Sequence, residues 1–142
     1  ISTVDVFQKG IPKIKTVMTP FPHSIAVTAS LAEAEVMMRH HSIRHLPVCE
    51  GHKLFGILAE HDLRVRHREL AVVGDVCMRN PYVVELDTPL DVVASEMGQR
   101  DATCVLVVKT EKLVGILTMT DICRILAATL REGIPSGDDE AA

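Results

Sequence analysis

The stretch G-I-L-T-M-T-D at residues 115–121 is a changed copy of G-I-L-A-E-H-D at residues 56–62, which lies 59 positions earlier. Each stretch is typical of a buried strand that runs into a helix. The copies differ in their chemistry: Thr118 and Asp121 place a hydroxyl and a carboxylate three residues apart, whereas Ala59 precedes Asp62. The same offset, without a gap, relates Val17 to Val76, Pro22 to Pro81, Leu31 to Leu90, Met38 to Met97, Val48 to Val107 and Leu54 to Leu113. A constant offset of this length indicates two copies of one structural unit.

Each copy predicts the same order of elements, strand–helix–strand–strand–helix. Opening strands are expected at 23–27 and 82–86, hairpin strands at 45–49, 54–58, 104–108 and 113–117, and closing helices from near 61 and near 120. A helix follows each opening strand. In the first copy Ser30 and Glu33 form a capping box at its start. In the second copy we expect Thr88 to cap the helix, with Pro89 at the first helical position.

The composition suits a pair of units that share one core. The chain has 142 residues, of which 47% are hydrophobic and 24% are charged, as in ordinary globular proteins. One unit of roughly 60 residues would be marginal alone, because it buries too small a fraction of its surface. We therefore expect the two units to pack sheet to sheet, related by a pseudo-two-fold axis.

Charge, hydropathy and cysteine usage argue against several classes of protein. A net charge of −4 and an aromatic content of 3% disfavour nucleic-acid binding. The longest aliphatic run, residues 104–108, is too short to span a membrane, and no secretory signal is visible. The four cysteines show no C-x-x-C spacing and are interpreted as reduced thiols: Cys49, Cys77, Cys104 and Cys123. These features predict a cytoplasmic protein with no membrane partner.

The chain resembles a tandem pair of cystathionine β-synthase (CBS) domains, also called a Bateman module, as found in stand-alone CBS-domain proteins. The resemblance rests on residues 17–19 and 76–81 at the unit starts, residues 43–48 before the first hairpin, and the two G-h-h-x-x-x-D endings. It implies an α+β (α/β) fold of two β-α-β-β-α repeats packed as a pseudo-two-fold pair. CBS domain 1 is expected at 12–68, CBS domain 2 at 72–129, and a solvated C-terminal tail at 130–142.

Thr118 and Asp121 have two interpretations. The tetrad T-x-x-D alone is a common helix-capping motif. In proteins that the chain resembles, the same ending binds adenosine nucleotides, with the carboxylate on the ribose hydroxyls and the Thr or Ser hydroxyl on the ribose or phosphate. A carboxylate accepts only, and therefore matches a diol that donates twice. Free N–H groups at a helix start suit a phosphate. We favour ligand binding, with capping as a second role of the same atoms.

The resemblance also implies which residues surround the ligand. Together with Thr118 and Asp121, the principal site would contain Thr19, Pro22, His23, Ile43, Arg44 and His45. The mirrored, weaker site would contain Asp62, Pro81, Tyr82, Val83, Thr103 and Cys104. It is expected to be weaker because Ala59 lacks the hydroxyl and Glu60 would repel a phosphate.

Other site chemistries are disfavoured. The cluster of His40, His41 and His45 lacks a completing cysteine or carboxylate, so we expect no metal site. No H-E-x-x-H, G-x-S-x-G or P-loop motif is present. The chain is therefore predicted not to be an enzyme and to require no cofactor, with the nucleotide acting as a regulatory ligand.

Two functions from different classes remain. The first is a regulatory module that binds AMP, ADP, ATP or an S-adenosyl compound and signals to an unknown effector protein. The second is a purely structural dimerisation module, and the chain could also be a regulatory fragment of a larger enzyme or transporter. A homodimer is expected in either case, because Met37, Met38, Met97 and the closing helices supply more apolar helix surface than one pair needs to bury.

Overall fold

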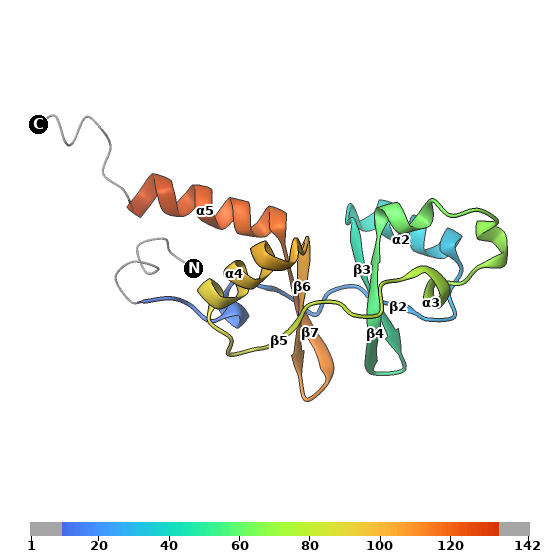
Figure 1. Ribbon diagram of the computed structural model, residues 1–142, viewed down its shortest axis with the longest axis horizontal. Helices are drawn as coiled ribbons and strands as arrows, with labels where there is room; N and C mark the ends of the chain where they lie inside the picture. The colour runs from blue at the N-terminus through green and yellow to red at the C-terminus, as the bar shows by residue number, and fades with distance from the viewer. Residues whose placement is uncertain (1–9, 134–142) are drawn as a thin grey trace, which may run out of the picture.

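The computed structural model describes residues 10–133 and shows two repeats of one unit (Figure 1). The first repeat contains η1 (Ile14–Thr16), β1 (Thr19–Pro20), β2 (Ile25–Ala26), α2 (Leu31–His41), β3 (His45–Glu50), β4 (Lys53–Ala59), η2 (Glu60–Leu63) and η3 (Arg68–Leu70). The second contains α3 (Val73–Val76), β5 (Val83–Glu85), α4 (Leu90–Arg100), β6 (Cys104–Lys109), β7 (Lys112–Thr118) and α5 (Met119–Gly133). The α+β class and the two-repeat arrangement are confirmed.

Six of the seven strands form two equivalent three-stranded halves, and the seventh, β1, pairs with β7. In each half a short parallel strand precedes an antiparallel hairpin, giving the order β2-β3-β4-β7-β6-β5. The halves meet through one antiparallel pair, Lys53 with Lys112, at the ends of β4 and β7. The four predicted hairpin strands are confirmed to within one or two residues at each end, whereas the opening strands are shorter than predicted.

Alternating side chains divide the core into three clusters. One face of each half packs against its own helices: Leu46 and Leu58 join the cluster under α2, and Val105 and Leu117 join the cluster under α4. The opposite faces share a third cluster, built around Ile57, Cys104, Leu106 and Ile116. Successive residues of a strand point to opposite faces, so each hairpin contributes to its own cluster and to the shared one.

The segment that leads into each repeat is packed into the other repeat. Ile14, in η1, is fully buried with the α4 cluster, and Val73, in α3, is fully buried with the α2 cluster. Figure 1 shows the blue leading segment beside α4 and α3 beside the first repeat. The backbone pairs Thr19–Ile116 and Ile57–Met78 are equivalent under the 59-residue offset. The pseudo-two-fold relation therefore extends to the exchanged segments.

Two glycines allow these segments to cross the last strand of the opposite hairpin. A Cβ on Gly56 would clash with the carbonyl oxygen of Met78, and a Cβ on Gly115 would clash with the side chain of Met18. The two obstacles differ, because a side chain can move aside and a hydrogen-bonded backbone cannot. Met78 is held to Ile57 in both directions, by N–H···O bonds of 2.8 and 3.0 Å.

The helix starts follow the prediction in the first repeat and depart from it in the second. Ser30 Oγ accepts a hydrogen bond from the Glu33 N–H at 3.0 Å, which is one of the two hydrogen bonds of the predicted capping box. Thr88 does not cap α4: its hydroxyl donates to the Glu85 carbonyl at 2.8 Å, and Pro89 occupies the cap position. The first free N–H of α4, on Leu90, instead donates to the carbonyl of Pro12 at 2.9 Å. The exchanged leading segment thus replaces the side-chain cap.

The prediction of a closing helix in the first repeat is wrong. The chain makes only the single turn η2, and His67 then adopts a left-handed conformation (φ 54°). The reason is that the first repeat lacks the apolar side chains that α5 has in the second repeat. Ile125 and Leu126 of α5 are replaced, at the equivalent positions, by Arg66 and His67, so a helix there would have little to bury.

Several expectations concern the ends, the cysteines and the membrane. α5 continues to Gly133, so residues 130–133 of the predicted tail are helical, and residues 134–142 lie outside the described part.

All four cysteines are described, and all are free thiols. Within residues 10–133, none of the helices combines the length and the apolar character that a membrane-spanning segment needs.

We predict that Gly56→Ala destabilises the protein more than Gly115→Ala, since only the second clash can be relieved by moving a side chain. Overpacking of this kind costs about 1–3 kcal/mol. Gly98→Ala in α4 is the matched control, because nothing lies within 4 Å of its added methyl, and it should stabilise by about 0.5–1 kcal/mol. Urea-induced unfolding measures all three. Equal stability of Gly56→Ala and Gly98→Ala would contradict the crossing constraint.

Candidate functional site

Thr118 and Asp121 form a reciprocal cap at the start of α5. Asp121 Oδ2 accepts from the Thr118 N–H at 2.9 Å and from the Thr118 hydroxyl at 2.9 Å. The Thr118 oxygen in turn accepts from the Asp121 N–H at 3.2 Å. The capping interpretation of the tetrad is therefore realised in the structure.

The cap leaves part of Asp121 available. Both hydrogen bonds from Thr118 end on Oδ2, whereas Oδ1 lies 3.8 Å from the guanidinium group of Arg124. The side chain is 27% exposed. One carboxylate oxygen can therefore accept from a ligand while the other holds the helix start. The Thr118 hydroxyl proton is committed to Asp121, so the threonine orients the carboxylate.

All eight residues predicted for the principal site line one cavity of about 650 Å³. These residues are Thr19, Pro22, His23, Ile43, Arg44, His45, Thr118 and Asp121. The walls come from three segments, 19–23, 42–47 and 116–124, and from Thr103. They meet because β1 pairs with β7, which brings the leading segment of the first repeat against the end of the second. That the eight residues bind a ligand stays a prediction.

The cavity also contains residues that the sequence reasoning missed. They are Ser42, Pro47, Ile116, Met119, Thr120 and Arg124. Arg124 has a clear signal, since it follows Asp121 by three residues and therefore lies on the same helix face. Met119 and Thr120 form the first turn of α5, where backbone N–H groups point outward. The Met119 N–H is already used, because it donates to the Thr103 carbonyl at 2.8 Å.

Thr103 lies in this cavity and not apart from it. Sequence reasoning assigned it to the mirrored site, yet it lines the 650 Å³ cavity, and its hydroxyl lies 2.8 Å from His45 Nε2. His45 and Thr103 belong to different repeats, so this hydrogen bond joins the two halves at the cavity wall. Burial and the nearby His61 and Arg44 lower the pKa of His45, against a smaller opposing effect of Asp62.

The first repeat offers a different environment at the mirrored position. Asp62 Oδ2 accepts from the Ala59 N–H at 2.8 Å, and Ala59 supplies no hydroxyl. The other oxygen lies 3.2 Å from His61 Nε2. Both oxygens of Asp62 thus have partners in the protein, and Glu60 is 3.9 Å from Arg44. At Asp121 the second oxygen has a longer contact, 3.8 Å to Arg124.

The remaining residues of the predicted mirrored site have other contacts in the protein. Cys104 is buried in the shared cluster, where burial raises the pKa of its thiol to about 12. Tyr82 packs against the α4 cluster with Arg100 over its ring, 4.6 Å from the centroid. Val83 is the first residue of β5 and pairs with Leu106, and Pro81 lies just before that strand. Of the six residues predicted for this site, only Thr103 lines the 650 Å³ cavity.

The histidines near the cavity contact each other. The rings of His23 and His41 stack with centroids 3.5 Å apart, and His40 meets His41 edge-on at 4.8 Å. Within residues 10–133, no three His, Cys, Asp or Glu side chains are grouped so that they could hold a metal ion. Of the three histidines, only His23 lines the 650 Å³ cavity, and its ring stacks on that of His41.

The family model for the CBS domain matches the chain twice, at residues 14–67 and 73–128. The chain belongs to the CBS domain family. The resemblance of its sequence to a tandem CBS pair is thereby confirmed. CBS domain pairs are regulatory modules and not catalytic ones.

Similar proteins include CBS pairs solved with adenosine compounds. The CBS domain pair of protein MJ0100, in complex with 5-methylthioadenosine and S-adenosyl-L-methionine, is 30% identical with a TM-score of 0.73, over 82% of this chain and 97% of that one. CBSX2 in complex with AMP is 26% identical with a TM-score of 0.75, over 85% and 99%.

Some curated relatives are much longer than this chain. L-aspartate semialdehyde sulfurtransferase of Methanocaldococcus jannaschii is 30% identical over 118 residues, which are 81% of this chain and 23% of that protein. The chain spans about a quarter to a third of the length of the first two curated relatives that it matches.

We predict that stability falls as the pH drops below the ordinary histidine value of about 6.5. Because the pKa of His45 is lower in the folded protein, the unfolded chain binds protons first, and the penalty is complete below the folded pKa. His45→Gln keeps a hydrogen-bonding group toward Thr103 but cannot titrate. It should lose less stability than the unchanged protein between about pH 7.5 and about pH 5.5. Urea midpoints at the two pH values test this, and an equal loss would contradict it.

Proposed function

We propose that the chain is a regulatory module that binds an adenosine nucleotide in the 650 Å³ cavity, with Asp121 as the principal ligand-binding residue. The observation that carries this proposal is the geometry of Asp121. Its Oδ2 is fixed by Thr118, and its Oδ1 remains for a ligand in a cavity walled by both repeats. A preoriented carboxylate oxygen is suited to the hydroxyl donors of a ribose.

The rest of the cavity fits the other parts of a nucleotide. Arg124 and the first turn of α5 lie beside Asp121 and offer positive charge and N–H groups to phosphates. Pro22, Ile43 and Pro47 supply apolar wall for a base. The ligands of the similar CBS pairs, AMP, 5-methylthioadenosine and S-adenosyl-L-methionine, have adenosine in common. This supports an adenosine compound and leaves the substituent at the 5′ position open.

The proposal makes the two repeats unequal. The site at Asp121 is the tighter one, because Asp62 has His61 at its second oxygen and no threonine at position 59. The chain itself performs no catalysis in this proposal; it changes shape or partner affinity when the nucleotide binds, and an effector protein or domain responds. A regulatory fragment of a larger enzyme or transporter would use the same site.

An alternative function is a structural dimerisation module. Exposed apolar side chains on three helices favour it: Val36 on α2, Val92 on α4, and Leu126 and Leu130 on α5. Met38 and Met97, which suggested this surface from the sequence, are instead buried in the clusters of their own repeats. The two functions are compatible, since dimerisation does not require an empty cavity.

We predict that the unchanged protein binds AMP, ADP, ATP or S-adenosylmethionine more tightly than GMP, and that Asp121→Ala weakens the tighter binding event roughly 10- to 150-fold. This range corresponds to a hydrogen bond to a charged group, about 1.5–3 kcal/mol. Isothermal titration at a temperature well below the melting transition measures it, because loss of the cap also lowers stability by about 1 kcal/mol. Nucleotide carried through purification must be removed first.

Asp62→Ala is the matched control for this titration, since the chain supplies the equivalent carboxylate in the other repeat. It should change the tighter binding event less than twofold, within ordinary experimental scatter. Equal losses from the two variants would remove the proposed asymmetry. Unchanged affinity in a folded Asp121→Ala protein, or no binding of any adenosine compound, would leave the structural function as the better account.

We also predict a homodimer that buries the exposed residues of α2, α4 and α5. Sedimentation velocity at micromolar protein should show a species near twice the chain mass of 15.6 kDa. Leu126→Glu should shift the protein toward monomer, because a carboxylate in an apolar interface is left unpaired. Cys123→Ser, on the same exposed helix, is the control and should remain dimeric. A monomer at every concentration for the unchanged protein would refute this.

A further inference from the structure

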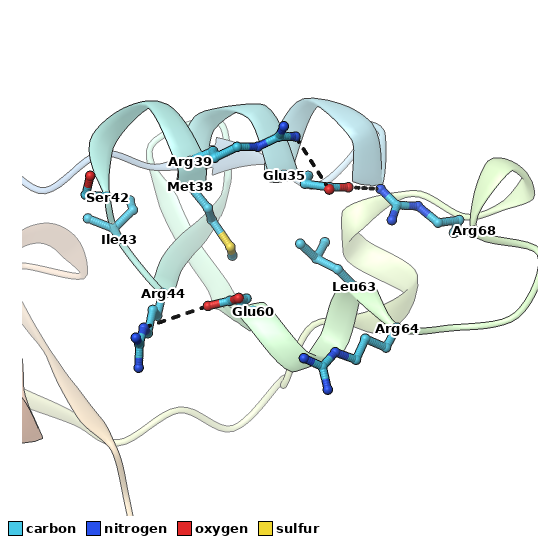
Figure 2. Close-up of a pocket in the computed structure, with 10 residues that line it drawn as sticks. All are labelled: Glu35, Met38, Arg39, Ser42, Ile43, Arg44, Glu60, Leu63, Arg64 and Arg68. Carbon is cyan, nitrogen blue, oxygen red and sulfur yellow. Dashed lines mark hydrogen bonds and ion pairs between the residues drawn. The ribbon is translucent and has the colours of Figure 1, made fainter.

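A second cavity, of about 590 Å³, lies within the first repeat between α2 and η2 (Figure 2). Four arginines line it: Arg39 from α2, Arg44 before β3, and Arg64 and Arg68 after η2. Figure 2 shows the apolar side chains of Met38 and Leu63 between these charged groups. Met38 and Leu63 are buried, so they form the floor of the cavity.

The arginines belong to the first repeat alone. At the 59-residue offset, their equivalents are Gly98, Thr103, Cys123 and Ala127. In the second repeat α5 is a continuous helix over two of these positions, Cys123 and Ala127, whereas the first repeat ends its helical turn at Leu63 and leaves the cavity. The charge is therefore not required by the repeat architecture, which forms without it in the second copy.

Two glutamates neutralise only part of this charge. Glu35 pairs with Arg68 and, at 3.5 Å, with Arg39; the hydrogen bond and charge of Arg68 hold the pKa of Glu35 below its usual value. This pairing fastens the segment after η2 to α2. Glu60 lies 3.9 Å from Arg44. With four arginines and two glutamates, the lining carries a net charge of +2 (4 − 2).

Arg44 and Arg64 are the groups left for a ligand. Arg44 has one long ion pair at the surface, and exposed pairs of this kind contribute little. Arg64 is exposed and makes no ion pair or hydrogen bond within residues 10–133. A concave surface concentrates the potential of such charges, and the planar guanidinium group fits a phosphate through paired N–H donors.

We propose that this cavity is a second binding site, for a diphosphate or a phosphate ester, with Arg64 and Arg44 as the residues that hold the anion. Anion binding here does not depend on nucleotide binding in the other cavity. The charge of +2 matches a phosphate dianion. The floor of Met38 and Leu63 accommodates a small apolar group attached to it.

The two cavities share one wall, which gives the second site a regulatory consequence. Ser42, Ile43 and Arg44 line both cavities. An anion that draws Arg44 toward Arg64 changes the wall that a base would contact in the other cavity. Binding at the two sites is therefore coupled, and the coupling acts equally in both directions.

The test uses pyrophosphate as the probe, titrated calorimetrically into the full chain without nucleotide, at ionic strength matched with sodium chloride. We expect saturable binding that Arg64→Gln weakens about tenfold or more. Arg66→Gln is the matched control: Arg66 is an exposed arginine two residues away that does not line the cavity. It should bind pyrophosphate as the unchanged protein does.

Two further variants locate the bound anion. Asp121→Ala removes the carboxylate proposed to bind the nucleotide and should leave pyrophosphate binding unchanged. A loss of nucleotide binding can therefore be told apart from a loss of pyrophosphate binding. Arg124→Gln removes the guanidinium beside α5 and should also have no effect. The proposal is overturned by the absence of pyrophosphate binding, by equal losses in Arg64→Gln and Arg66→Gln, or by a loss in Arg124→Gln alone. Circular dichroism checks that each variant is folded.

Discussion

The carbonyl oxygen of Met78 occupies the space that a side chain at Gly56 would need, and the side chain of Met18 does the same at Gly115. These two close approaches let the leading segment of each repeat cross to the other, where Ile14 and Val73 complete the opposite core. The rest of the structure depends on this exchange. It supplies the backbone acceptor for the start of α4, and it brings residues 19–23 against the end of β7.

The candidate nucleotide site follows from that crossing. Asp121 and Thr118 belong to one repeat, whereas Thr19 and His23 come from the segment that crosses to it. The capping and ligand-binding interpretations of the tetrad are compatible because a carboxylate has two oxygens. One oxygen holds the helix start and the other is aimed by that same bond. A helix cap is thus a way to preorganise an acceptor before any ligand arrives.

The sequence predicted the parts of the fold that depend on local pattern. The offset of 59 located the hairpins, and the family resemblance gathered eight residues that do share one cavity. Prediction from the sequence failed where two contacting residues lie far apart along the chain. Nothing in the pattern around Ile14 says that it packs under α4. Nor does the pattern around Thr103, which was assigned to the mirrored site, show its contact with His45 of the other repeat. The absence of a closing helix in the first repeat could have been predicted from Arg66 and His67, which interrupt the apolar stripe.

The exchange of leading segments has an evolutionary meaning. A single ancestral unit could have satisfied the same contacts as a symmetric pair of identical chains, each donating its leading segment to its partner. In such a pair every substitution appears twice, so both clefts must keep the same chemistry. Within one chain the two units are free to differ. Ala59 opposite Thr118, and the arginines opposite Gly98 and Ala127, are differences that a pair of identical chains could not hold.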